Sequence, residues 1–234
     1  STLKQLAKPE VNVCTVEDPI ELVEPSFNQM QVQRNIDLDF STGVRTLMRQ
    51  DPDIIMIGEI RDMETAQMAI QAALTGHLVL STLHTNDAPS AVTRMLDIGV
   101  PPYLLQSSIL GVMAQRLVRT LCPHCKQATE ISDDEWNALV KPWRSKKPDH
   151  VMSPVGCLEC RNTGYMGRMG IYEMFTFTGK VRKLVNASCD ISELRQQTLK
   201  DGLKPLRLSG ASKVAAGVTT IEEVIRVAPP PLAL

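Results

Sequence analysis

The stretch DPDIIMIGEIRD, residues 51–62, decides the fold. Its apolar run 54–57 stands between an Asp-Pro pair and Gly58. A short apolar run with such borders is typical of a strand that is buried on both faces, as in parallel sheets. Glu59 follows this strand directly, and Arg61 lies two residues further on. Because ligands bind at the carboxyl ends of strands in open α/β sheets, we expect Glu59 to lie at a binding site.

Strands and helices alternate in the first half of the chain. The apolar runs at 11–17, 53–58 and 77–83 predict strands. The segments between them have apolar residues at helical spacing, together with capping residues and glycines that mark helix ends. The first predicted helix begins at Ser41 or Thr42, and the second extends from Asp62 to Leu74, before Gly76. The third begins at Asp87 or Ser90 and ends at Gly99, and the fourth extends from Pro101 to about Leu121. This alternation indicates βαβ units around a mainly parallel sheet, so the predicted fold class is α/β.

The second half of the chain has a different pattern. From Cys122 to Gly170 the sequence is rich in cysteines, prolines and other loop residues, and it predicts little regular structure. Amphipathic helices are predicted after Phe175, at 178–187, 191–201, 205–216 and 219–227. We therefore expect an α/β part that is followed by a cysteine-bearing segment and a helical part.

The composition argues against several classes of protein. The net charge of −1 and the charged fraction of 22% provide no basic surface of the kind that nucleic acids attract. No segment approaches the roughly 18 unbroken apolar residues of a membrane helix. The first residues, STLKQLAKPE, lack the apolar core of a secretory signal. We therefore predict a cytoplasmic protein that does not bind nucleic acid.

Two Cys-x-x-Cys pairs predict a metal centre. Cys122 and Cys125 form the first pair, and Cys157 and Cys160 form the second. Each pair can direct two thiolates at one cation, and together they complete the tetrahedral four-sulfur shell that Zn²⁺ prefers. Such a closed shell has no open position for a substrate, so the predicted role is structural. The alternatives are a redox pair, plain reduced cysteines, or a site in which His124 replaces a thiolate.

Polar residues follow each of the predicted strands in the first half. Glu17 and Asp18 end the first strand, Glu59 follows the second, and His84 follows the third. Each of them alone reads as a solvent-facing or structural side chain. Neighbouring parallel strands, however, bring their carboxyl ends to one edge of a sheet, and that conjunction indicates a site.

The chemistry that this edge suggests is phosphoryl transfer. An apolar strand that ends in an acid is the Walker B form, in which a carboxylate orients Mg²⁺ or the attacking water. Gly58 replaces the usual aspartate of this element, so Glu59 is the predicted acid. His84 is a candidate to contact a γ-phosphate, and Arg61 is a candidate either to bind a phosphate or to pair with a neighbouring acid.

Several long stretches resemble the ATPases of type II secretion and of type IV pilus extension. They are VCTVEDPIE (13–21), MRQDPDIIMIGEIRD (48–62), TGHLVLSTLHTND (75–87), QRLVRTLCPHCK (115–126) and GYMGRMGIYEMF (164–175). In that family the first four correspond to the Asp box, an atypical Walker B element, the His box and the start of a tetracysteine zinc segment. The resemblance extends from about Val11 to Val227.

The resemblance implies a RecA-like, P-loop NTPase core, a homohexameric ring that hydrolyses ATP with Mg²⁺, and work on an inner-membrane platform with its adaptor proteins. By position, the resemblance implies that Glu59 is the catalytic glutamate and that Glu17 is a second catalytic carboxylate. The residues that it implies for nucleotide or magnesium binding are Asp18, Arg61, His77 and His84. The zinc ligands that it implies are Cys122, Cys125, Cys157 and Cys160. The implied parts are the core at 1–121, the tetracysteine segment at 122–176 and a C-terminal helical subdomain at 177–234. The stretch AQRLVRTLC favours type II secretion, with type IV pilus extension as the alternative.

The phosphate-binding loop of these ATPases, G-x-x-x-x-G-K-[ST], does not occur in the sequence. The Gly179-Lys180 pair is followed by Val181 and has Met174 in place of the first glycine. In the family this loop precedes the Asp box, so we expect the chain to begin just after it. We also expect these residues alone to hydrolyse ATP negligibly, and a non-catalytic, zinc-bearing docking module is the alternative function.

Overall fold

The computed structural model describes residues 2–228, which form two compact units. The first unit comprises the residues up to 85 together with 90–110 and 182–189. The second unit comprises 86–89, 111–181 and the residues from 190 onward. Each unit is therefore built from segments that are separated in the sequence. The domain boundaries expected after 121 and after 176 stay a prediction.

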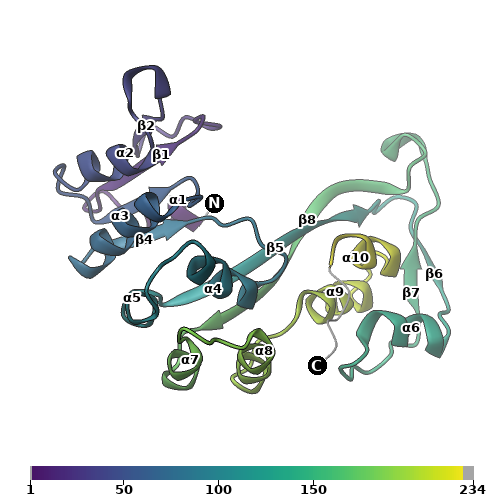
Figure 1. Ribbon diagram of the computed structural model, residues 1–234. Helices are drawn as coiled ribbons and strands as arrows, with labels where there is room; N and C mark the ends of the chain where they lie inside the picture. Colours follow the sequence, from purple (N-terminus) through teal and green to yellow (C-terminus); the bar gives the residue numbers. More distant parts are fainter. Residues whose placement is uncertain (1, 229–234) are drawn as a thin grey trace. The chain divides into compact units, whose positions relative to one another are not determined.

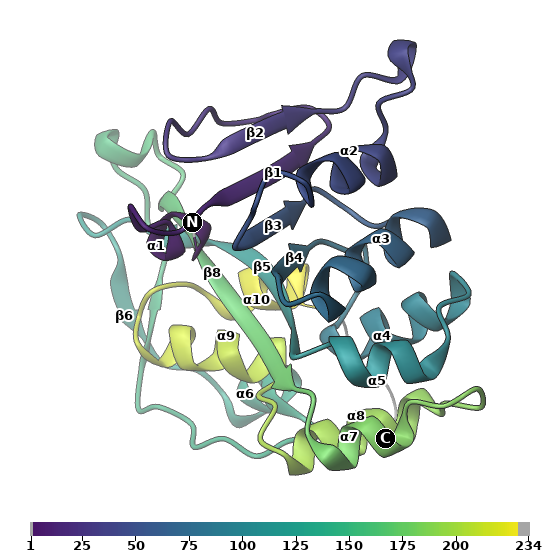
Figure 2. The same cartoon turned by 90° about the vertical axis from the view of Figure 1, so that its left-hand side faces the viewer.

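The first unit contains a four-stranded sheet in the order β2-β1-β3-β4, and every neighbouring pair is parallel (Figure 2). The strands are β1 (Val13–Glu17), β2 (Asn28–Gln31), β3 (Ile54–Ile57) and β4 (Leu78–Ser81). The α/β class, the parallel sheet and the strands predicted at 11–17, 53–58 and 77–83 are confirmed. The polar strand β2 was not predicted, because NQMQ lacks the apolar pattern of a buried strand.

The first unit contains, wholly or largely, the helical elements α1 (Thr2–Leu6), the 3₁₀ turn η1 (Arg34–Ile36), α2 (Phe40–Leu47), α3 (Met63–Leu74), α4 (Ala88–Asp97) and α5 (Pro102–Ser108). Helices α2 and α3 pack against the sheet, and α5 packs against α3. Asp62 caps α3 as predicted, since its side chain accepts a hydrogen bond from the Thr65 amide. The N-cap predicted for α2 was wrong: Asp39, and not Ser41 or Thr42, accepts the first amide hydrogen bond there.

The helix predicted from Pro101 to about Leu121 was also wrong. The helix α5 ends at Ser108, and the strand β5 (Gly111–Leu121) follows it. Its Leu, Met, Ala, Gln and Arg residues suit a helix, so local propensity favoured the wrong element. The tertiary partner decides the outcome, because β5 pairs antiparallel with β8 (Tyr165–Thr176) over most of its length. Exposed and less exposed residues alternate along β5 with the period of a strand.

The second unit is organised around the long β5–β8 ribbon (Figure 1). The segment expected to be loop-rich also contains β6 (Gln127–Thr129), α6 (Asp133–Val140), β7 (Val151–Ser153) and η2 (Leu158–Cys160). The predicted C-terminal helices are confirmed as α7 (Gly179–Leu184), α8 (Ile191–Lys200), α9 (Leu206–Ala215) and α10 (Ile221–Val227). Helices α9 and α10 pack against the ribbon, and their buried apolar residues form one core with Trp136, Val118 and Ile171.

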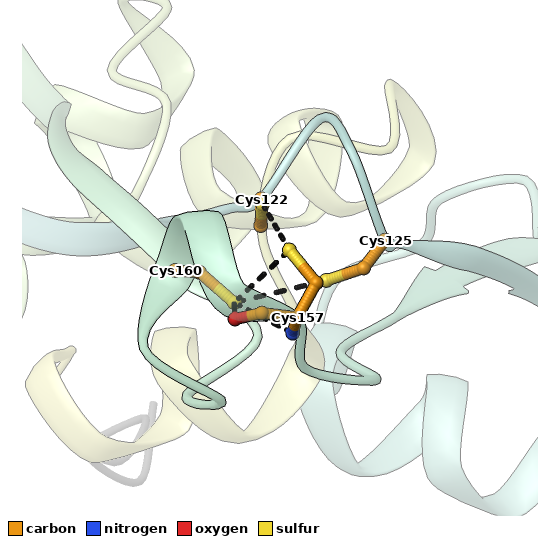
Figure 3. Close-up of side chains that lie close together, drawn as sticks. All are labelled: Cys122, Cys125, Cys157 and Cys160. Carbon is orange, nitrogen blue, oxygen red and sulfur yellow. Dashed lines mark hydrogen bonds between the residues drawn. The ribbon is translucent and has the colours of Figure 1, made fainter.

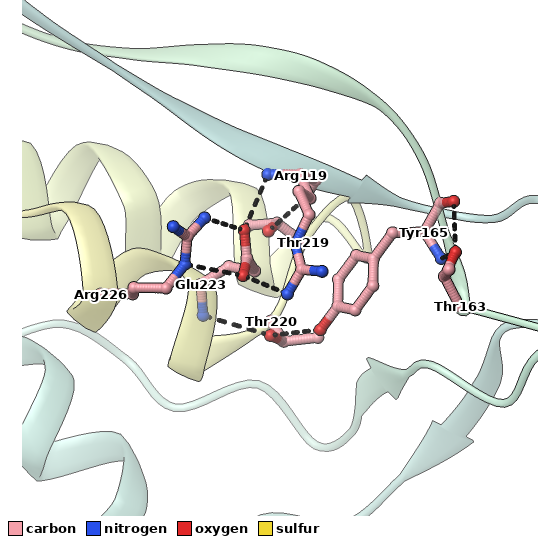
Figure 4. Close-up of polar contacts among 7 residues, drawn as sticks. All are labelled: Arg119, Thr163, Tyr165, Thr219, Thr220, Glu223 and Arg226. Atoms are coloured by element: carbon pink, nitrogen blue, oxygen red, sulfur yellow. Dashed lines mark hydrogen bonds and ion pairs between the residues drawn. The ribbon is translucent and has the colours of Figure 1, made fainter.

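A buried carboxylate joins α10 to β5 in this unit (Figure 4). The Glu223 side chain is 2% exposed and accepts hydrogen bonds from the Arg119 guanidinium at 2.7 Å, from the Arg119 amide at 3.0 Å and from Arg226 at 2.9 Å. Burial alone would raise its pKa, but these donors lower the pKa of Glu223 to about 2. The Arg119 guanidinium also lies 4.1 Å from the centre of the Tyr165 ring. Glu223 is therefore ionised at neutral pH and fixes the helix to the strand.

A second buried carboxylate, Glu173 of β8, accepts two backbone hydrogen bonds from distant parts of the chain. The Ala88 amide at the start of α4 donates to it at 2.7 Å, and the Leu206 amide at the start of α9 donates at 3.1 Å. Burial raises the pKa of this carboxyl. An ion pair between Asp87 and Arg195, at 2.8 Å, attaches the same short segment 86–89 to α8.

None of the helices described within residues 2–228 combines the length and the apolar character that a membrane-spanning helix needs.

Candidate nucleotide site and metal centre

The carboxyl ends of β3 and β4 carry a cluster of three charged or ionisable side chains. Oε1 of Glu59 lies 2.5 Å from Nη2 of Arg61, and Oε2 lies 3.2 Å from Nε2 of His84. A carboxylate only accepts hydrogen bonds, so Nε2 of His84 carries the proton in this contact. The Glu59 side chain is 13% exposed, whereas those of Arg61 and His84 are 60% and 85% exposed. The acid is thus set into the edge and its two partners face solvent.

Glu59 is ionised in this arrangement. The hydrogen bond from Arg61 holds the pKa of Glu59 below its usual range, and the charge interactions with Arg61 and His84 act in the same direction. An ionised carboxylate at the end of a parallel strand can orient a metal-bound or attacking water.

The backbone that leads to Glu59 is closely packed. The Gly58 amide donates to Val16 O at 2.8 Å, and the Thr82 hydroxyl donates to Gly58 O at 2.6 Å. A Cβ atom at Gly58 would lie 3.2 Å from Phe40 Cε1 and 3.3 Å from Val16 O. Gly58 therefore stands at a position with little room for a side chain, and the next residue supplies the acid at the end of the strand.

Glu17 and Asp18 lie at the carboxyl end of β1, the strand next to β3. Oε1 of Glu17 accepts hydrogen bonds from Thr15 and Gln29. Asp18 lies 3.5 Å from Arg34, and its charge also acts on Arg61. Predicted residues from all three strands therefore lie at one edge of the sheet, although no hydrogen bond or ion pair of the described chain joins Glu17 to Glu59.

His77 does not join this group. It precedes β4, whereas His84 follows that strand, so His77 lies at the amino edge of the parallel sheet. Its Nδ1 atom donates to the Ala72 carbonyl oxygen at 2.8 Å and thereby closes the end of α3. The assignment of His77 to nucleotide binding stays a prediction.

A hollow beside the cluster is lined by polar residues of both signs. The residues that line it are Val32, Arg34, Asp37, Asp39, Phe40, Ser41, Arg61, Asp62, Glu64 and Thr65. Arg61 reaches both this hollow and Glu59, and it is the side chain that links the two. The sequence did not predict the roles of Thr15, Gln29, Arg34 and Thr82, because an isolated polar residue within or after a strand is no distinctive signal.

The four predicted cysteines lie close enough together to hold one metal ion (Figure 3). Their sulfur atoms all lie within 4.8 Å of one another, and the measured separations include 3.9 Å for Cys122–Cys157 and 3.8 Å for Cys125–Cys160. A tetrahedron of thiolates at the usual Zn–S distance has edges of about 3.8 Å. The cluster is thus compatible with zinc, and none of its pairs forms a disulfide.

Backbone amides around the cysteines favour thiolates. The Cys157 and Gly164 amides each donate to Cys160 Sγ at 3.2 Å, and the Gly156 amide donates to Cys125 Sγ at 3.2 Å. Burial opposes ionisation, but the two amides lower the pKa of Cys160 to about 6. Amide donors to ligand sulfurs are the outer contacts that orient the thiolates of a structural metal site.

Comparison with solved structures defines the class of protein. The chain superposes on the pilus retraction motor PilT, solved with bound ADP, with a TM-score of 0.69 and 25% identity over 99% of this chain and 57% of that one. The Legionella pneumophila ATPase DotB gives a TM-score of 0.61 at 23% identity, over 91% of this chain and 50% of that one, which is a likeness of fold. The chain therefore shares the fold of the pilus retraction motor PilT and of the ATPase DotB.

Sequence comparison defines the family. The model of the type II/IV secretion system protein family matches residues 1–226, and the chain belongs to that family. The type IV pilus assembly ATPase TfpB of Acinetobacter baylyi is 58% identical over 98% of this chain and 39% of its own length. The type II secretion system protein HxcR of Pseudomonas aeruginosa is 48% identical over 97% of this chain and 44% of its own. The chain thus spans less than half the length of these relatives.

Proposed function

We propose that these 234 residues are the part of a motor ATPase that carries its catalytic carboxylates and its zinc segment. The observation that supports this most directly is the ionised Glu59 between Arg61 and His84, at the carboxyl edge of a parallel sheet. The family is one of ATPases, and a strand-end acid with a neighbouring cation and imidazole suits phosphoryl transfer.

The proposed roles follow from position at this edge. Glu59 orients and polarises the water that attacks the γ-phosphate, and His84 contacts that phosphate from the next strand. Glu17 is the second catalytic carboxylate, and Asp18 belongs to the shell around Mg²⁺. Arg61 exchanges Glu59 for a phosphate oxygen when a nucleotide binds. His77 contributes only if a nucleotide reaches the amino edge as well.

The triphosphate contacts of a phosphate-binding loop are the part of such a site that this sequence does not supply. We propose that the whole protein contains that loop in sequence outside these 234 residues, which is consistent with relatives more than twice as long. Loss of one electrostatic donor can cost an active site about 10²- to 10³-fold in rate, so these residues alone should hydrolyse ATP negligibly.

The proposed working form is a homohexamer in the cytoplasm, at the periphery of the inner membrane. Its partners there are the platform and adaptor proteins of a secretion or pilus machine, and nucleic acid is not among them. The first candidate machine, which the sequence pattern favours, is type II protein secretion, in which the motor drives assembly of the pseudopilus. Type IV pilus extension is the second candidate, and the higher identity with TfpB (58%) than with HxcR (48%) supports it. Loss of surface pili on gene deletion, with exoprotein secretion unchanged, would identify the pilus branch.

We further propose that the tetracysteine group binds one Zn²⁺ with a structural role. The spacing of the sulfurs, the amide donors and the lowered pKa of Cys160 support this assignment. The metal would connect the turn at 122–125 with the turn at 157–160 and would leave no position open for a substrate.

The test of the proposed activity compares two polypeptides. One is the 234-residue chain, and the other is the chain joined to the upstream sequence of its own gene. We expect magnesium-dependent ATP hydrolysis only from the longer polypeptide, with loss of the activity in Glu59→Gln. Equal inactivity of the longer polypeptide, with retained binding to inner-membrane proteins, would instead support a zinc-bearing docking module.

A further inference from the structure

We propose that Gln29 and Thr15 position the carboxylate of Glu17, so that only one of its oxygens is available to a nucleotide or its metal. This inference rests on the proposed ATPase function, because it concerns the second catalytic carboxylate of the same site. Gln29 and Thr15 do not touch the reacting atoms themselves, and they act through Glu17 as positioning residues.

Two donors converge on one oxygen atom of Glu17. The Thr15 hydroxyl donates to Oε1 at 2.6 Å, and the Gln29 side-chain amide donates to the same atom at 3.0 Å. Thr15 is fully buried, so its hydroxyl needs a partner within the protein and finds it here. Within residues 2–228, no hydrogen bond or ion pair reaches Oε2 of Glu17. The carboxylate is thus fixed through one oxygen and presents the other.

The Gln29 side chain is itself completely constrained. Its second amide proton can serve the Leu22 carbonyl oxygen, at 3.0 Å from Nε2, and its Oε1 atom accepts the Glu24 amide at 2.7 Å. Both donors and the carbonyl oxygen of one amide are therefore used, and this fixes which end of the amide faces Glu17. The loop 18–27 and the carboxylate are held by the same side chain.

A neighbouring glutamine offers a matched comparison. In the β1–β2 register, Gln31 pairs with Glu17 and Gln29 pairs with Thr15. Gln31 nevertheless makes its contact with the Ile20 amide, at 3.3 Å, and not with the carboxylate. The hydrogen bond to Glu17 therefore comes from Gln29, which lies two residues before the direct cross-strand partner of Glu17. A glutamine that served only to hold β2 in the sheet would not need this bond.

The first arm of the test needs no nucleotide and uses the 234-residue chain. The side-chain amide protons of Gln29 and Gln31 can be followed by ¹⁵N-resolved NMR. In Glu17→Ala the Gln29 side-chain amide protons should exchange faster with water, because the amide loses this acceptor. Those of Gln31, which donate no hydrogen bond to Glu17 in the described part of the chain, should exchange at the wild-type rate. Gln29 exchange rates that do not respond to Glu17→Ala would overturn the inference, whatever the enzyme assay shows.

The second arm uses the longer polypeptide that contains the phosphate-binding loop. Gln29→Met removes the donors and the acceptor at similar length, and kcat should fall about 10- to 100-fold, as for other residues that orient a ligand group. KM for ATP should stay unchanged, because the lost interaction concerns the transition state. Gln31→Met is the control and should retain the wild-type kcat.

A double-mutant cycle separates positioning from general damage. Because Gln29 acts through Glu17, Gln29→Met should have no further effect on the residual rate in a Glu17→Ala background. Equal fold-losses in the two backgrounds would overturn the inference. Absence of ATPase activity from the wild-type longer polypeptide would instead contradict the proposed function. The NMR experiment would still decide whether Gln29 positions Glu17.

Discussion

Nε2 of His84 lies 3.2 Å from Oε2 of Glu59, although the two residues are 25 positions apart in the sequence. The parallel pairing of β3 and β4 creates this relationship, since Ile57 pairs with Ser81 and both strands end at the same edge. Because the acid and the imidazole are in contact at that edge, single substitutions of Glu59 and of His84 can test their roles separately.

Replacing the acid should abolish hydrolysis while the nucleotide still binds. In the polypeptide that contains the phosphate-binding loop, we expect Glu59→Gln to lower kcat by about 10²- to 10³-fold, because the neutral amide cannot polarise the attacking water. Retained ATP affinity, measured with a fluorescent nucleotide, would separate this effect from unfolding. The same exchange at the exposed Glu10 is the control, and a Glu59→Gln enzyme with the wild-type rate would contradict the assignment.

A side chain at Gly58 should destabilise the first unit. The added methyl group of Gly58→Ala would meet the Phe40 ring and Val16 O at 3.2–3.3 Å, and crowding of this kind costs about 1–3 kcal/mol. At Gly179 nothing lies within 4 Å of the added carbon, so Gly179→Ala should be neutral or slightly stabilising. Denaturant unfolding monitored by hydrogen exchange in β3 measures the difference. Equal stability of the two variants would show that the packing at Gly58 has room to relax.

The tetracysteine group should bind one zinc ion per chain. Cys160→Ser removes a sulfur that accepts two backbone amides, so we expect loss of the metal and faster hydrogen exchange over 157–164. Cys189 lies outside the group, so Cys189→Ser should keep the full metal content. Metal analysis of the reduced protein by mass spectrometry reads out both variants. Full zinc occupancy in Cys160→Ser would contradict the four-sulfur assignment.

The Glu223 carboxylate should make the second unit sensitive to acid. Its pKa of about 2 in the folded chain lies below the ordinary unfolded value of about 4.3, so its contribution is complete above that value and is lost as the pH falls toward 2. Glu223→Gln should cost about 1–3 kcal/mol near pH 7 and much less near pH 2.

The neighbouring acid provides the control for this prediction. Glu222 adjoins Glu223 in α10, and Glu222→Gln should leave the pH profile of thermal unfolding close to that of the wild type. If Glu223→Gln lost as much stability between pH 5 and pH 2.5 as the wild type does, the acid sensitivity would belong to another group.

The sequence predicted the part of the site that depends only on which residues follow the parallel strands. An apolar run that ends in an acid marks Glu59, and the next apolar run places His84 at the same edge. The helices from 178 onward were equally predictable, because their apolar residues recur at helical spacing. The hydrogen bonds of Thr15 and Gln29 to Glu17 were not predictable, because they depend on the register between β1 and a polar strand without an apolar pattern.

The β5–β8 ribbon was missed for a related reason. Its residues favour a helix locally, and only the antiparallel partner beyond the cysteine segment decides for a strand. Long-range pairing of this kind leaves little trace in a single stretch of sequence. The convergence of the two Cys-x-x-Cys turns was predictable because the metal chemistry supplies the missing long-range information.

The buried carboxylate of Glu173 has a consequence for the order of events during synthesis. Its two backbone partners, the amides of Ala88 and Leu206, stand on opposite sides of it in the chain. Ala88 leaves the ribosome before Glu173, and Leu206 leaves after it. The second unit therefore cannot complete its core until the C-terminal helices have been made, and the contacts that close it are far apart in sequence. A nascent chain that stops short of Leu206 would leave Glu173 with only one of its two backbone partners, and incomplete units of this kind are prone to aggregation.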